Sequence, residues 1–129
     1  MPTRKPQLDR QRTEAKIQEA LTVFLQARGW LVERTHGSAF MRGFPDLYLA
    51  HPKWGQRWVD VKVEGAYSFT KAQRMKWPIW EQHGVGIWIL TGSDQANYDK
   101  LFAPQNWRQY WRPSWKIPTV NDALAFFDR

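Results

Sequence analysis

Apolar residues recur at helical spacing near the start of the chain. Ile17, Leu21 and Leu25 fall on one side of a helix predicted over residues 13–28. Glu14 precedes them at the same spacing, so it shares their core-facing side. A carboxylate in that position needs a partner, because burying an unpaired charge is costly.

Three short strands are predicted next, over residues 30–35, 45–50 and 57–63. The last two are joined by a segment rich in turn residues, which favours a hairpin. Side chains alternate along a strand, so Asp60 and Lys62 lie on one face of the third strand and its valines lie on the other.

A second helix is predicted over residues 71–83. Thr70 and Gln73 have the spacing of a capping box at its start, and Pro78 should bend or split it. The apolar run over residues 85–90 predicts a central strand that is buried on both faces. The predicted order of elements is therefore α-β-β-β-α-β.

The two ends of the chain differ from this core. Residues 1–12 hold four basic residues and one acidic residue, which predicts a flexible basic arm. Residues 93–129 show a looser pattern, with an aromatic and basic stretch over 104–118 and a last helix starting at Thr119. We expect a single domain, in which the arm, a core over 13–92 and a C-terminal extension packed on that core follow one another.

The charge balance points to a nucleic-acid partner. The chain of 129 residues has 19 Lys and Arg against 12 Asp and Glu, a net charge of +7, which favours phosphate polymers. A membrane is not expected, since no basic amphipathic helix stands out and no apolar run could span a bilayer. The absence of cysteine excludes thiolate metal sites and suits a cytoplasmic protein. No glycine-rich nucleotide loop is found, so no nucleotide cofactor is expected.

Two acids and a lysine are the candidate chemistry. Asp46 and Asp60 lie in neighbouring predicted strands, so a hairpin would bring them together. Mg²⁺ prefers oxygen ligands, often one or two carboxylates with water and substrate phosphate, and the main-chain carbonyl of Val61 could be a further ligand. Lys62 could orient the attacking water and offset charge that develops on the phosphate. Singly, Pro-Asp is a common turn dipeptide and Asp-x-Lys an ordinary charge pair; their combination favours phosphodiester hydrolysis.

These residues form part of a longer ordered pattern. In chain order it reads Glu14, Gly29-Trp30, Arg34, Gly43-Phe44-Pro45-Asp46-Leu47, Asp60-Val61-Lys62, Phe69-Thr70-Lys71-Ala72-Gln73 and Gly84-Val85-Gly86-Ile87. Over about residues 13–91 it resembles the PD-(D/E)xK nuclease superfamily, in particular the small VRR-NUC branch, and it shares features with archaeal-type Holliday junction resolvases. Asp60 stands where members of this branch more often carry Glu.

The resemblance implies an α/β fold with a restriction-endonuclease-like α-β-β-β-α-β core, a mixed central sheet flanked by helices, and an aromatic-rich extension outside the core. It also implies DNA cleavage that depends on Mg²⁺, with Mn²⁺ able to substitute. Asp46 and Asp60 would be metal ligands, Glu14 would complete the metal shell directly or through water, and Lys62 would be the catalytic lysine. Gln73 would face the site, a role compatible with the capping box. The residues expected to contact DNA are Arg34, His36, Ser38, Arg42, Lys71 and Arg74.

The leading hypothesis is an endodeoxyribonuclease that cuts branched DNA, with Holliday junction resolution as its most specific form, in a bacterial or phage-infected cell. Paired incisions in a four-way junction require two active sites, so a homodimer is expected. Two alternatives remain. The same site could act on flap, nicked or linear DNA, or the chain could be a DNA-binding module without catalysis, which binds through its basic arm and aromatic stretch.

Overall fold

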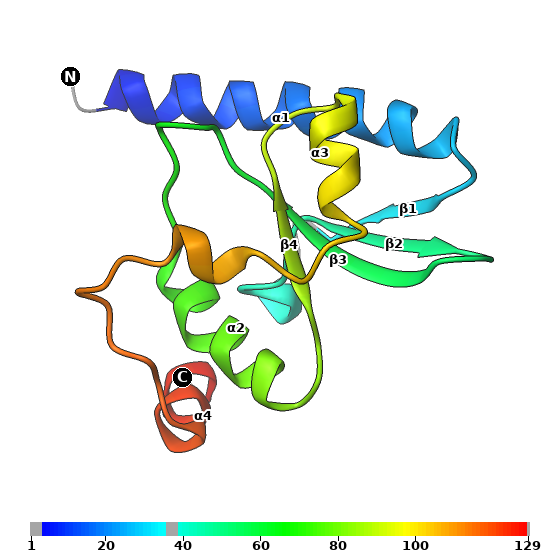
Figure 1. The fold of residues 1–129 in the computed structure, drawn as a ribbon. Helices are drawn as coiled ribbons and strands as arrows, with labels where there is room; N and C mark the ends of the chain where they lie inside the picture. The colour runs from blue at the N-terminus through cyan, green and yellow to red at the C-terminus, as the bar shows by residue number, and fades with distance from the viewer. Residues whose placement is uncertain (1–3, 36–38, 129) are drawn as a thin grey trace.

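The core elements follow one another in the predicted order (Figure 1). The structure is a computed structural model, and it describes residues 4–35 and 39–128. Its elements are α1 (Arg4–Gln26), β1 (Leu31–Arg34), η1 (Ala39–Met41), β2 (Leu47–His51), β3 (Gly55–Val61), α2 (Lys71–Gln82), β4 (Ile87–Leu90), α3 (Gln95–Lys100), η2 (Trp107–Tyr110) and α4 (Val120–Phe127).

The four strands form one mixed sheet in the order β1-β2-β3-β4. β1 and β3 each pair antiparallel with β2, and β4 pairs parallel with β3. β2 and β3 form the predicted hairpin, in which Leu47 is opposite Val59. The chain is thus a mixed α/β protein whose sheet is flanked by helices, as predicted.

The two faces of the sheet carry separate apolar clusters. On one face, Leu21 and Leu25 of α1 pack with Val59 and Val61 of β3. On the other, Trp77 of α2 belongs to a cluster with aromatic side chains from the loop before α2 and from η2. Figure 1 shows α1 and α2 on either side of the strands. The valines of β3 therefore face α1, and Asp60 faces α2, as strand alternation predicts.

α1 is longer than predicted, and α2 is not split at its internal proline. α1 begins at Arg4, so residues 4–12, which were expected as an arm, are helical. Pro6 is compatible with this, because the N–H groups of the first turn have no partner within the helix. α2 continues through Pro78 without a break. Burying about 200 Å² of an aromatic such as Trp77 contributes about 5 kcal/mol, which exceeds the cost of about 3 kcal/mol for a proline inside a helix.

β4 lies at the edge of the sheet, and the prediction of a central strand was wrong. Its outer edge is nevertheless covered, because side-chain amides bond to it as a further strand would. Asn106 accepts a hydrogen bond from the Ile89 N–H (2.6 Å) and donates one to the Ile89 carbonyl (2.9 Å). Gln105 accepts one from the Ile87 N–H (2.9 Å). β4 is therefore buried although it is an edge strand.

Candidate active site

Asp46 and Asp60 meet at the open end of the β2–β3 hairpin. Leu47 pairs with Val59. Asp46 directly precedes Leu47 and Asp60 directly follows Val59, so the two acids lie opposite each other. The Asp46 N–H donates a hydrogen bond to Asp60 Oδ1 (3.2 Å), and the Val61 N–H donates one to Asp46 Oδ2 (2.8 Å). The hairpin therefore brings the two acids into contact, as their spacing predicts.

Lys62 is the cation of this site, and it is buried. Its Nζ lies 2.9 Å from Asp60 Oδ2 and donates hydrogen bonds to the Ser68 carbonyl (2.8 Å) and to Gln73 Oε1 (3.0 Å). The Lys62 Nζ also lies 4.8 Å from the centre of the Phe69 ring. An ammonium has three donors, and three oxygen atoms surround this one. Its position is therefore set by the protein.

Gln73 connects the helix start to the site. Its backbone N–H donates to Thr70 Oγ1 (3.1 Å), and its Oε1 accepts from the Thr70 N–H (3.1 Å), which completes the capping box. The same Oε1 accepts from Lys62, and Nε2 donates to Asp60 Oδ1 (3.3 Å). The capping interpretation is confirmed, and the side chain also faces the site as the resemblance implied.

The surroundings of the acid pair disfavour a second negative charge beside Asp60. Burial, followed by the charge of Asp60, raises the pKa of Asp46 to about 8. Burial is also the largest reason why the pKa of Glu14 is raised; Lys62 opposes this effect and Asp60 adds to it. Such shifts mark places where an added positive charge would be bound favourably.

The site opens into a cleft of about 410 Å³ between α1, the sheet and the start of α2. A water in the liquid takes about 30 Å³, so the cleft has room for a hydrated cation and a phosphate group. Glu14 lines the cleft, and within the described residues its carboxylate forms no ion pair. Arg10, one helical turn before Glu14, lines it too. The predicted basic arm did not place Arg10 at the site; the i, i+4 spacing to Glu14 is the signal that could have done so.

The acid pair fits a divalent cation. Asp60 Oδ2 is buried and accepts no hydrogen bond from the described part of the chain, although Lys62 Nζ is close. Two carboxylates are a common protein contribution to a Mg²⁺ site, and Val61 lies on the cleft wall beside them. Within residues 4–35 and 39–128, no group of three or more acidic, histidine or cysteine side chains gathers. Glu14 thus does not join the pair in a three-carboxylate group.

The residues expected to contact DNA after β1 lie apart from the cleft or cannot be placed. Arg34 is exposed at the end of β1 and lines a different pocket, together with Tyr48 and Trp58. His36 and Ser38 fall outside the described residues.

The remaining expected DNA contacts lie over aromatic rings beside α2. The guanidinium of Arg42 is 4.9 Å from the centre of the Phe126 ring, and Lys71 Nζ is 5.8 Å from the same ring. The guanidinium of Arg74 lies 4.9 Å from the ring of Trp115. None of these three side chains lines the cleft.

Comparison with protein-family models, with curated proteins and with solved structures finds no match to this chain. Among the described helices, none is both long and apolar enough to cross a bilayer. The site itself is therefore the basis for a functional assignment.

Proposed function

We propose that this protein is a Mg²⁺-dependent endodeoxyribonuclease that hydrolyses phosphodiester bonds in branched DNA. The observation that carries the proposal is the contact between Asp46 and Asp60, with Lys62 Nζ 2.9 Å from Asp60, in an open cleft. The order of elements and the mixed sheet agree with the restriction-endonuclease-like core that the resemblance implies.

In this proposal, Asp46 and Asp60 hold the cation, and the Val61 carbonyl is a further ligand. Bound Mg²⁺ would supply Lewis-acid activation of the phosphate and lower the pKa of an attacking water. Lys62 offsets the charge that develops on the phosphate. Because Ser68 and Gln73 hold its ammonium before substrate arrives, little reorganisation is needed during the reaction.

The choice of branched DNA rests on the resemblance, while the net charge of +7 favours nucleic acid in general. Resolving a four-way junction takes two incisions, so we propose that the active form is a homodimer. Flap, nicked and linear DNA are the other substrates that the same site could cut.

Cleavage of four-way, flap, nicked, linear and single-stranded DNA with Mg²⁺ or with EDTA tests the proposal. We expect cleavage that requires Mg²⁺ and is fastest on the four-way junction. Asp60→Asn and Lys62→Met should each lower the rate by at least about 100-fold, since electrostatic stabilisation by one preorganised group is commonly of that size. Methionine keeps the length of the lysine side chain without its charge.

Lys53→Met is the matched control. Lys53 lies in the turn at the other end of the hairpin, so this substitution removes the same charge far from the acid pair. The control should cleave at the wild-type rate. Cleavage by Asp60→Asn at that rate would refute the site, and equal rates on all DNA forms would refute the preference for branched DNA.

A DNA-binding module without catalysis has less support. That interpretation needs free aromatic rings over residues 104–118. Trp107 is fully buried, and Trp111 and Trp115 pack against the cluster that contains Phe69 and Trp77. These rings are thus engaged in packing, one fully and two partly buried, which is the ordinary role of tryptophan.

A further inference from the structure

Three cations converge beside α4 without an acidic partner. Arg42 and Lys71 lie over the Phe126 ring, and Lys76 Nζ lies 4.3 Å from the centre of the Phe127 ring. Within the part of the chain that the structure describes, none of the three forms an ion pair. We call Arg42, Lys71 and Lys76 the basic cluster.

The fold holds these residues together through Gly43. Gly43 has a φ of +78°, and a Cβ added there would lie 2.6 Å from the carbonyl oxygen of Ala72 in α2. The Trp77 indole N–H also donates a hydrogen bond to the Gly43 carbonyl (2.8 Å). The segment that carries Arg42 is thus packed directly on the helix that carries Lys71 and Lys76.

The charges of the basic cluster are close to one another and are not neutralised. Burial lowers the pKa of Lys76, and the neighbouring positive charge of Arg42 lowers it further. Aromatic faces attract cations but carry no net charge, so the rings hold these side chains without neutralising them. Positive charges that stay together in this way are typical of a site for a phosphate.

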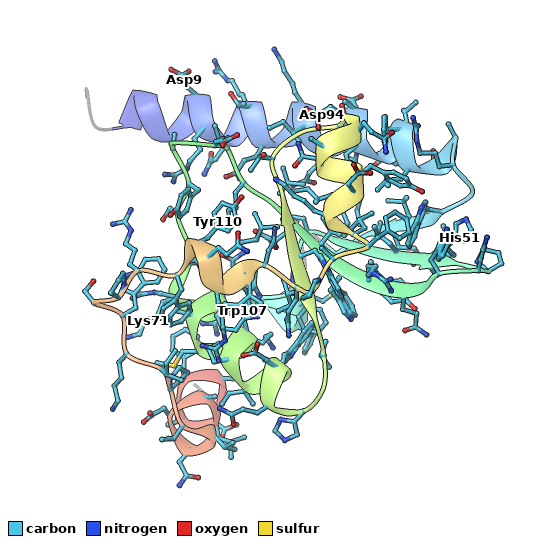
Figure 2. The ribbon with its side chains drawn as sticks, in the orientation of Figure 1. Asp9, His51, Lys71, Asp94, Trp107 and Tyr110 are labelled. Carbon is cyan, nitrogen blue, oxygen red and sulfur yellow. The ribbon has the colours of Figure 1, made fainter. Side chains whose placement is uncertain are left out.

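Two residues of the basic cluster are close in sequence to residues that line the cleft. Lys71 directly follows Thr70, which lines the cleft, and Arg42 precedes Asp46 by one short turn. In Figure 2, Lys71 lies on the side of the molecule opposite His51, which marks the far end of the hairpin. A DNA strand whose scissile phosphate occupies the cleft can therefore continue towards the basic cluster.

We propose that Arg42, Lys71 and Lys76 form a second phosphate site, which binds the DNA backbone away from the scissile phosphate. The identity of the ligand as DNA rests on the proposed function. The aromatic side chains of α4 position the cations, so the C-terminal helix takes part in binding the substrate.

Salt-dependent DNA binding in EDTA tests the second phosphate site without requiring cleavage. The variant Arg42→Gln/Lys71→Gln is compared with the control Lys53→Gln/Arg28→Gln, which removes the same charge at the far ends of the hairpin and of α1. For each protein, the Kd for a linear duplex and for a four-way junction is measured over a range of salt concentrations. Thermal melting verifies that each variant is folded.

Each phosphate contact that is lost should reduce the slope of log Kd against log salt by roughly 0.9. The Arg42/Lys71 variant should therefore lose between one and two units of slope, and the control should lose clearly less. An equal loss in both variants would refute the site, as would wild-type protein that does not bind DNA. Binding is measured apart from cleavage. If wild type does not cleave DNA but the Arg42/Lys71 variant shows the reduced slope, the nuclease proposal is refuted and the second phosphate site is retained.

Discussion

Replacing Asp46 with Asn should stabilise the metal-free protein at alkaline pH, although the change alters a residue of the proposed active site. Asp46 is held against Asp60 by the hairpin, and its pKa is raised to about 8 by burial and by that neighbour. Asparagine stays neutral at every pH. Its carbonyl can accept from the Val61 N–H, and its amide can donate to Asp60, as a protonated Asp46 would.

The magnitude follows from linkage. The ordinary pKa is 3.8, so between 3.8 and about 8 the folded state binds more protons at Asp46 than the unfolded state does. Stability therefore falls as pH rises through this window. At about 1.4 kcal/mol per pKa unit, ionisation of this one group opposes folding by roughly 5 kcal/mol at pH 8, which is comparable with the whole stability of a small domain.

Urea unfolding in EDTA, followed by tryptophan fluorescence near pH 5 and near pH 8, measures this difference. We expect Asp46→Asn to be the more stable protein, with a larger advantage near pH 8. Asp9→Asn is the control, because it makes the same chemical substitution at a carboxylate that is 59% exposed. It should change stability by less than about 0.5 kcal/mol.

Addition of Mg²⁺ extends the test. A cation that binds only the folded state adds about 2.7 kcal/mol of stability at 100 times its Kd. Wild type should gain this stability and Asp46→Asn should gain much less. If Asp46→Asn proves less stable than wild type near pH 8, or shows the same pH dependence, the electrostatic account of the acid pair is wrong.

Three further predictions concern single residues. Gly43→Ala should lower the melting temperature more than Gly65→Ala does. The two glycines have similar φ values of +78° and +76°, but only Gly43 lacks room for a Cβ. Equal losses would mean that the close contact with α2 is unimportant. Gln73→Ala should slow Mg²⁺-dependent cleavage more than Thr70→Ala, since both break the capping box but only the former also removes contacts to the site; equal rates would reduce Gln73 to a cap. Asn106→Ala should cost about 2–4 kcal/mol in urea unfolding, because two buried backbone groups of β4 lose their partner; a loss below about 1 kcal/mol would show that water replaces it.

Local periodicity in the sequence was sufficient for the order of elements and for much of the site. Side-chain alternation predicted that Asp60 and Lys62 share a face, and helical spacing predicted that Glu14 turns towards the core. The turn residues between β2 and β3 predicted the hairpin that joins Asp46 to Asp60. Each of these inferences depends on residues within a few positions of one another, and that is the range over which backbone geometry repeats.

The tertiary structure decided what depends on residues far apart in the chain. β4 is an edge strand that is covered by the amide of Asn106, which lies 17 residues beyond Ile89. Arg10 reaches the cleft because α1 starts earlier than its apolar pattern predicts. The raised pKa of Asp46 comes from burial and from Asp60, which only the folded chain brings together. Burial and charge proximity are properties of the whole packed domain, so the sequence pattern identified the chemical groups while the fold determined their protonation and contacts.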